Sequence, residues 1–209
     1  MDSHGLSTRG KITATALELF SINGFSTVSV RDIGKAVGIK ESSLYYHFKN
    51  KEEILRTIFQ QAEEEMQRRK NRFNDALSLS PKVPCENFVL AGQAYLEGFL
   101  LEPSMMKLIR VLTIEKQRNK DAAALYRQLL FTEPGAHQAK VFSLLMDRQE
   151  IPKDNAEAMA AEYQAILLYV FQKHFSGSQA EAPDHTEALT ELAALLRRFF
   201  VRYFECGEG

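Results

Sequence analysis

Cysteine, tryptophan and long apolar runs are the features that this sequence has least of. The only cysteines are Cys85 and Cys206, and there is no Trp. Two distant thiols without a CxxC pair exclude a disulfide framework and a cysteine-based zinc site. No apolar stretch approaches the roughly 18 residues needed to cross a bilayer, and the first ten residues are polar. The sequence therefore predicts a soluble, unprocessed protein of the reducing cytoplasm, with no membrane, metal or cofactor.

Catalytic motifs are missing as well. The five histidines are scattered, and neither an HExxH pattern nor a glycine-rich phosphate loop occurs. The acidic residues near aromatic ones lack a His or Cys with which to form a catalytic pair, and neither thiol has an activating neighbour. We therefore expect that the protein is not an enzyme.

Charge is unevenly distributed along the chain, although the net charge is only -1. Residues 1–51 contain seven Lys and Arg against four Asp and Glu, a net charge of +3, and the remainder carries -4. A basic end on an acidic body suits a protein that places one end on phosphate. The bias is small and supports nucleic-acid binding without establishing it.

Apolar residues recur at intervals of three and four along the whole chain, whereas alternating, strand-like runs are scarce. This pattern predicts an all-α protein. The clearest break is Ser78–Pro84, which contains two prolines and two serines. We predict a helix-turn-helix head in residues 1–50 and a helical ligand-binding and dimerisation domain in residues 51–209, joined by a linking helix over about 50–76. Further helices are predicted at 85–101, 103–116, 121–131, 134–148, 154–175 and 186–204.

The head has the local signals of three short helices. The first is predicted from Ser7 to Ile22. Ser29 and Asp32 have the spacing of a capping box that begins a second helix, which Gly38 ends. A third follows within a few residues, with its apolar side chains spaced to face inward. Two short helices joined by a turn that contains Gly form a helix-turn-helix.

Residues 25–55 also contain a specific set of apolar, glycine and polar positions. They are Phe25, Val28, Ile33-Gly34, Val37-Gly38-Ile39, Leu44-Tyr45, His47-Phe48 and Lys51. In this register the stretch from Ser26 to Leu55 resembles the DNA-binding head of the TetR family of bacterial regulators. The resemblance implies a DNA-binding regulator that pairs through its two C-terminal helices and responds to a small molecule.

The side chains around the third helix are the predicted contacts to double-stranded DNA. A short helix held by two others can bring its first turns to base edges in the major groove. Serine hydroxyls and a Glu there suit base contacts, whereas Tyr, His and Lys donors suit phosphates. The predicted DNA-binding residues are Ser29, Arg31, Lys40, Glu41, Ser42, Ser43, Tyr45, Tyr46, His47 and Lys51.

This part of the chain departs from the family at two positions and leaves one alternative open. Lys40 stands where a Ser or Thr cap is common, so the third helix is less firmly started unless Ser42 serves instead. Glu41 stands where a neutral or basic residue is frequent, and its charge repels phosphate. The alternative role for either tyrosine is partial burial in the core, and for His47 a place on the solvated surface.

The last two predicted helices have the strongest apolar stripes. They carry more apolar surface than one helix pair needs for its own packing, which favours a four-helix interface between two copies. The alternative is that both stripes are ordinary core. The predicted homodimer residues are Tyr163, Leu167, Val170, Phe171, Leu192, Leu196, Phe199, Phe200 and Tyr203.

The segment between the head and these helices is rich in aromatics and Met, which suit an apolar ligand pocket. Arg110, Glu115 or His174 would supply its polar anchor. Any one of these residues has core packing as its alternative. The predicted ligand-binding residues are Tyr95, Phe99, Met106, Arg110, Tyr126, Phe142 and His174.

These features together predict a homodimeric transcriptional repressor that binds a palindromic operator and is released by a small-molecule inducer. Repression is favoured over activation because blocking a promoter needs only DNA binding and release. The alternatives are a transcriptional activator, and a helical interaction module that does not bind DNA.

Overall fold

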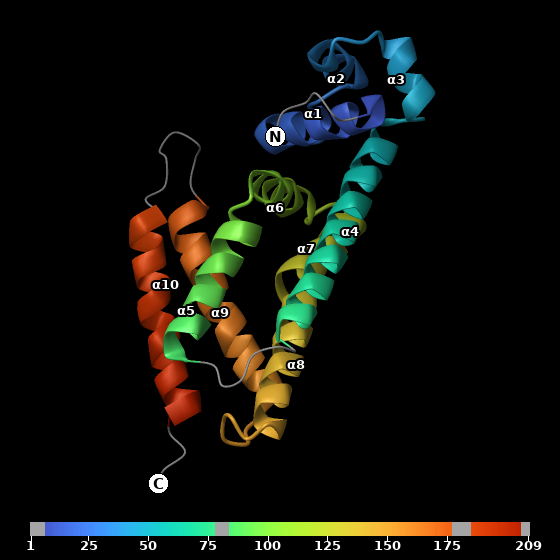
Figure 1. Cartoon of the computed structure of the whole chain (residues 1–209). Coiled ribbons are helices and arrows are strands. Elements are labelled where there is room, and N and C mark those ends of the chain that lie inside the picture. Colours follow the sequence, from blue (N-terminus) through green and yellow to red (C-terminus); the bar gives the residue numbers. More distant parts are fainter. Residues whose placement is uncertain (1–6, 78–83, 177–184, 206–209) are drawn as a thin grey trace. The chain divides into compact units, whose positions relative to one another are not determined.

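The computed structural model describes residues 7–77, 84–176 and 185–205 (Figure 1). These ranges contain helices and turns and no strand, which confirms the all-α prediction. The predicted breaks at 78–84 and 176–183 lie, but for Pro84 and Ser176, outside the described residues. In chain order the elements are α1 Thr8–Asn23, α2 Val30–Val37, α3 Glu41–His47, α4 Lys51–Leu77, α5 Cys85–Tyr95, η2 Leu96–Leu100, α6 Pro103–Glu115, α7 Lys120–Arg127, η3 Gln128–Thr132, α8 Glu133–Asp147, α9 Ala156–Phe175, α10 His185–Phe200 and η4 Val201–Glu205.

The chain forms two compact units. The first combines the residues up to Asn71 with Pro103–Arg127, so α6 and α7 belong to the same unit as α1 to α3. The second combines Arg72–Glu102 with the chain from Gln128 onward. A functional border near residue 50 remains a prediction.

Local capping explains where the helices of the head begin and end. The Ser29 hydroxyl accepts from the backbone N–H of Asp32, whose carboxylate accepts in return from the Ser29 N–H, so the capping box forms as predicted. Gly38 ends α2 in the left-handed conformation, with φ of 80°, which favours a residue without a Cβ. At the start of α4, the Asn50 side chain accepts from the Glu53 N–H, and the Glu53 carboxylate accepts from the Lys49 N–H.

A small core holds the three helices of the head against the start of α4. Helix α1 packs on α2, and α2 on α3, while α6 also contacts α1 (Figure 1). Burying a large aliphatic or aromatic side chain stabilises a fold by about 1.5–3 kcal/mol, so a few such residues suffice to fix this geometry. The fully buried apolar side chains here are Ile12, Ala16, Phe20, Ile33, Leu44 and Ile54.

In the second unit, α9 lies between α8 and α10, and α10 also packs on α5. Gly92 permits the close approach of α5 to α10, because a Cβ at this position would collide with the Leu196 side chain. Among the described residues, no helix has the length and apolar content that crossing a bilayer requires. The centre of the unit is a cluster of aromatic rings with neighbouring centroids 4.3–6.0 Å apart, formed by Phe88, Phe142, Tyr163, Phe199, Phe200, Tyr203 and Phe204.

Three helices pass directly into π-helical turns, which the sequence analysis did not foresee. The turn η2 continues α5, η3 joins α7 to α8, and η4 continues α10. A π-helical turn contains an extra residue and is frequent at functional sites. Pro103 begins α6 and Pro134 lies in the first turn of α8, as predicted from proline's missing N–H.

Candidate functional site

Helix α3 turns one apolar side chain inward and its polar side chains outward. Leu44 is fully buried, and Phe48 directly after the helix is 1% exposed. Ser42 and Ser43 are exposed, as are Tyr45 at 49% and Tyr46 at 87%. Hydroxyl groups therefore line the outer face of a helix that its two neighbours hold in place. For both tyrosines, exposure argues against the alternative of a place in the core.

His47 is half-buried at the end of α3. Its ring meets the Tyr46 ring edge-on, with centroids 5.3 Å apart, and its carbonyl accepts a hydrogen bond from Arg9. The imidazole thus lies beside the exposed tyrosines.

The start of α2 adds two predicted contact residues. Ser29 and Arg31 are both exposed. The Ser29 hydroxyl already takes part in the capping box, and it also donates to the Asp32 carboxylate over 2.6 Å. These hydrogen bonds hold the pKa of the Asp32 carboxyl below its usual range. Arg31 projects from the first turn of the capped helix.

Lys40 precedes α3 without capping it. Its side chain makes no capping hydrogen bond, and its backbone carbonyl accepts from the N–H groups of Ser43 and Leu44. Glu41 follows as an exposed acidic residue in the first turn, where a negative charge favours the helix dipole. The start of the helix thus depends on backbone and dipole rather than on a side-chain cap.

Lys51 has a structural role that was not predicted. Its ammonium donates to the carbonyls of Phe25 and Val28, at 2.6 and 2.7 Å, and lies 4.3 Å from the centre of the Phe25 ring. The ammonium also lies 3.5 Å from the Ser26 carbonyl, so all three of its donors face the connection between α1 and α2. A phosphate contact by Lys51 remains a prediction.

Arg9 is a positioning residue that sequence reasoning missed. Its guanidinium lies 4.2 Å from the centre of the Phe48 ring and donates to the His47 carbonyl over 2.9 Å. It also donates to the Thr57 hydroxyl and lies 3.8 Å from the Glu53 carboxylate. One side chain of α1 thereby ties the end of α3 to α4. No local pattern signals these contacts, because they span 38 and more positions.

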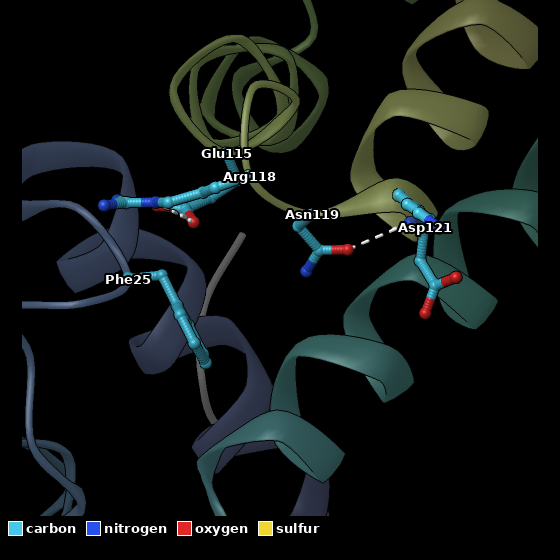
Figure 2. Close-up of a pocket in the computed structure, with 6 residues that line it drawn as sticks. Phe25, Glu115, Arg118, Asn119 and Asp121 are labelled. Carbon is cyan, nitrogen blue, oxygen red and sulfur yellow. Dashed lines mark hydrogen bonds and ion pairs between the residues drawn. The ribbon is translucent and has the colours of Figure 1, made fainter.

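A polar pocket of about 380 Å³ lies in the same unit, between Phe25 and the loop that joins α6 to α7 (Figure 2). Glu115 is 2% exposed and accepts two hydrogen bonds from the Arg118 guanidinium, which raise the pKa of that guanidinium. The Asn119 side chain accepts from the Asp121 N–H. The Glu115 carboxylate is therefore bound by Arg118 within its own loop, and its role as a ligand anchor remains a prediction.

The predicted dimer residues lie in the core of a single chain. Eight of them are at most 8% exposed, and Tyr203 is half-buried and donates to Glu162 over 2.6 Å. The cause is that α9 must pack against α8 and α10 at once, so its inner stripes are used within the unit. These side chains therefore have little exposed surface for contact with a second copy. This agrees with the alternative that both stripes are ordinary core.

The predicted ligand residues are divided between the two units. Met106, Arg110 and Tyr126 belong to the first, where the Lys116 ammonium lies 3.8 Å from the centre of the Tyr126 ring. The other four belong to the second unit, where Phe99 is 7% exposed. Their packing differs from residue to residue.

Two of those four make specific contacts within their own unit. Phe142 joins the aromatic cluster, with its ring 5.8 Å from that of Phe199. His174 Nε2 lies 2.6 Å from a Glu191 carboxylate oxygen and so links α9 to α10.

Two buried glutamines were missed by the sequence analysis. Gln138 is 9% and Gln164 4% exposed, and the Gln138 amide donates to the Gln164 side chain over 2.9 Å. Helical spacing could have found them, because Gln138 lies four residues before the buried Phe142 and Gln164 four after the buried Ala160. A polar residue on such an inward stripe is a stronger signal of a functional residue than another aromatic residue is.

The fold and these surfaces define a class: an all-helical protein with an N-terminal helix-turn-helix. Residues 12–58 match the family described as bacterial regulatory proteins, tetR family. The N-terminal part of the chain thus has the sequence pattern of this family's DNA-binding head. The match covers α1 to α3 and the start of α4, as the resemblance in the sequence indicated.

Curated relatives match the same part of the chain. The negative transcriptional regulator IcaR of the biofilm operon icaADBC, from Staphylococcus epidermidis, is 50% identical over 48 residues, which are 23% of this chain and 26% of the relative. The regulator AcrR from Shigella flexneri is 39% identical over 56 residues, 27% of this chain and 26% of AcrR. The matches span about a quarter of the length of these relatives. Both are named as transcriptional regulators and not as enzymes.

Solved structures show the fold over nearly the whole chain. A TetR-family regulator from Mesorhizobium loti has a TM-score of 0.75 at 18% identity, covering 94% of this chain and 96% of the other. A complex of SmeT with triclosan has a TM-score of 0.72 at 15% identity, covering 97% and 94%. The described helices after the head thus also follow a fold known from this family.

Proposed function

We propose that the chain is a DNA-binding transcriptional regulator that acts as a dimer on a palindromic operator. The observation that carries the proposal is the outer face of α3, where Ser42, Ser43, Tyr45 and Tyr46 are exposed while Leu44 is buried beneath them. An exposed row of hydroxyls on a rigidly supported short helix suits entry into the major groove. The name of IcaR, a negative regulator, favours repression.

The exposed residues divide into two groups by chemistry. Ser42 and Ser43, in the first turn of α3, would contact base edges, with Lys40 and Glu41 beside them. Tyr45, Tyr46 and His47 would donate to phosphates, which fix position without carrying sequence. When the residues at the capped start of α2 are included, the proposed DNA contacts are Ser29, Arg31, Lys40, Glu41, Ser42, Ser43, Tyr45, Tyr46, His47 and Lys51.

We propose dimerisation because one head contacts only one major groove of the operator. Two heads about 34 Å apart would read successive major grooves on one face of the duplex. Because the inner stripes of α9 and α10 are used within the chain, the proposed contact surface consists of their outer side chains. These include Tyr169, 52% exposed, and Val201 of η4, 49% exposed.

Release by a small molecule would pass through helix α6. This helix contacts α1, and Lys107 of α6 forms an ion pair with Glu18 of α1. A ligand that favours another position of α6 or α4 would therefore change the placement of the head and the fit of two heads to the operator. The complex of SmeT with triclosan supports a ligand-responsive fold. Fixed head separation on binding of a true inducer would contradict this route.

Selection of bound duplexes from a random pool by the full-length chain tests the DNA proposal. The expected result is a palindromic site whose half-sites are centred about 10 base pairs, or a multiple of that, apart. Affinity for this site should fall steeply with salt, because phosphate contacts release counterions. A comparison variant with Tyr46→Phe and Ser42→Ala, exposed changes that leave the core intact, should bind this site more weakly. Recovery of no preferred sequence, with salt-independent behaviour, would favour an interaction module instead.

A further inference from the structure

Three polar side chains form a cluster inside the apolar second unit. Tyr95 ends α5, Gln138 lies on α8 and Gln164 on α9. Both glutamines are at least nine-tenths buried, and burial raises the pKa of Tyr95 well above its usual value, while the nearby Gln164 acts in the opposite sense. A buried polar group that lacks a partner costs about 1–3 kcal/mol, so such a cluster needs a reason.

The hydrogen bonds of the cluster leave two polar atoms without a partner. Gln164 donates to the Leu130 carbonyl over 2.8 Å and accepts from the Gln138 amide over 2.9 Å, which satisfies both ends of its side chain. Within the described residues, Gln138 Oε1 and the Tyr95 hydroxyl are buried and have no hydrogen-bond partner. The first accepts only, whereas the second can donate as well as accept.

Two π-helical turns bring this cluster together. Tyr95 directly precedes η2, and the Leu130 carbonyl that binds Gln164 belongs to η3. Extra residues in helices are frequent at functional sites because they re-aim backbone and side chains. The turn η3 thus supplies a hydrogen-bond partner of Gln164, and η2 begins directly after Tyr95.

A groove connects Gln164 to the surface. It has a volume of about 280 Å³ and lies between α8 and α9. Its wall is mostly apolar, with Ala136, Ala165 and Leu168 among its residues and Phe131 at 51% exposure. Glu157 is the charged residue of the lining, and it is exposed at the start of α9. Of the three cluster residues, Gln164 lines this groove, and it places an amide in an otherwise mostly apolar wall.

We propose that Tyr95, Gln138 and Gln164 form the recognition site for a neutral, largely apolar alcohol or phenol that enters along the groove between α8 and α9. One ligand hydroxyl placed beside Gln164 would donate to Gln138 Oε1 and accept from the Tyr95 hydroxyl. No charged group belongs to the cluster, so an ionised ligand would be buried without a counter-charge. The inference rests on the proposed function, because it specifies the molecule that the regulator senses.

Paired probes that differ by one methyl group test the proposal. Binding of para-butylphenol and of its methyl ether, para-butylanisole, to the full-length chain is measured by titration calorimetry. The phenol is expected to bind at least about tenfold more tightly, because the ether leaves Gln138 Oε1 unpaired. Equal affinity of the two probes, or no binding of the phenol, would overturn the proposal.

Variants assign the preference to the cluster. Tyr95→Phe should weaken phenol binding about tenfold, and Gln138→Met should bring the affinity ratio of the two probes toward one. Tyr95→Phe should not lower the thermal midpoint of the free protein, because the lost hydroxyl has no partner there. Leu90→Met, a conservative change at an exposed position of α5, should leave phenol binding and the thermal midpoint unchanged. Wild-type affinities in both cluster variants would refute the assignment.

A groove variant separates a ligand from a second copy of the chain. Ala136→Phe should fill the groove and weaken phenol binding without changing the oligomeric state. Conversion to a monomer with unchanged phenol binding would show that the groove is a surface between copies and overturn the proposal. Binding of the selected duplex is measured in parallel, since normal DNA binding without phenol binding contradicts this inference alone, whereas loss of DNA binding by the wild type contradicts the proposed function.

Discussion

Two cationic side chains of the head, Arg9 and Lys51, form hydrogen bonds to backbone carbonyls of the protein itself. Arg9 links α1 to the end of α3, and Lys51 holds the carbonyls of the α1–α2 connection. Charged hydrogen bonds to backbone carbonyls are worth more than neutral ones. Both residues therefore stabilise the geometry of the reading helix, whatever they contribute on DNA.

Lys51→Ala should lower the free energy of unfolding by about 1–3 kcal/mol, because two part-buried carbonyls lose a charged donor. Urea unfolding followed by circular dichroism measures the effect. Lys49→Ala, at an exposed neighbouring position, is the control and should leave stability within about 0.5 kcal/mol. Equal stability of the two variants would restrict Lys51 to DNA contact.

Tyr46→Phe should weaken binding to the selected operator about tenfold and leave the thermal midpoint unchanged. The side chain is 87% exposed, so its hydroxyl contributes little to folding, whereas a hydrogen bond to phosphate is charge-assisted. Fluorescence anisotropy on the operator and on an unrelated duplex gives the measurement. Both affinities should fall alike, since phosphate contacts carry no sequence; a change confined to the operator would instead indicate a base contact.

The sequence could identify the exposed residues of α3 but not all of those that hold this helix in place. Exposed positions such as Ser42 and Tyr46 follow from the period of α3 around Leu44. The contacts of Arg9 could not be predicted, because they join residues that only the tertiary fold brings together. The buried Gln138 and Gln164 were predictable from helical spacing, but their pairing was not.

Helix α3 begins without a side-chain cap. Lys40 occupies the cap position with extended backbone angles, which suit a capping serine. Lys40→Ser should therefore raise the free energy of unfolding by about 1 kcal/mol. Thermal and urea unfolding measure the gain, and Lys35→Ser, within α2, serves as the control that should not stabilise. A destabilised Lys40→Ser variant would contradict this account.

The capping box of α2 makes stability depend on pH in a defined direction. Hydrogen bonds from Ser29 lower the folded-state pKa of Asp32 below the unfolded value of about 3.9. The resulting stabilisation is fully present above the unfolded pKa and is lost as pH falls through the folded one. Unfolding of the wild type and of Asp32→Asn should differ most near neutral pH and converge below about pH 4. A constant difference across this range would contradict the linkage.

Helix boundaries were largely predictable, since proline, glycine and Ser or Asn caps fix them locally. The π-helical turns were not, because their extra residue leaves the apolar spacing only slightly altered. The turns η2 and η3 depend on packing of the second unit and on the bond from Gln164 to Leu130. The helix propensity of the local sequence predicts neither this packing nor this hydrogen bond.

For the molecule as a whole, apolar stripes revealed burial but not what covers it. Leu167 and Leu196 were predicted to face a second copy, and both are fully buried in one chain. An apolar stripe indicates that one face of a helix is buried away from water. The same pattern arises whether a neighbouring helix or another chain covers that face. Assigning the partner needs the complete packing of α8, α9 and α10.

Substitution of outer side chains of the last helices by charged residues tests the proposed dimerisation. The double variant Tyr169→Arg and Val201→Arg should convert the dimer into a monomer and weaken operator binding at least tenfold. Both positions are about half exposed, so the single chain should remain folded. Analytical ultracentrifugation at micromolar concentration measures the state. Leu90→Arg, at an exposed position of α5, is the control and should remain dimeric; monomeric wild-type protein would refute the interface.

The π-helical turn η3 makes this region unusually responsive to chain length. One residue fewer would let α7 and α8 join as a continuous α-helix, in which each residue advances the helix by about 100°. A single deletion would then rotate every preceding side chain and withdraw the Leu130 carbonyl from Gln164. A one-codon deletion would thus displace both Phe131 of the groove and the Leu130 carbonyl bound to Gln164, where a substitution alters one side chain.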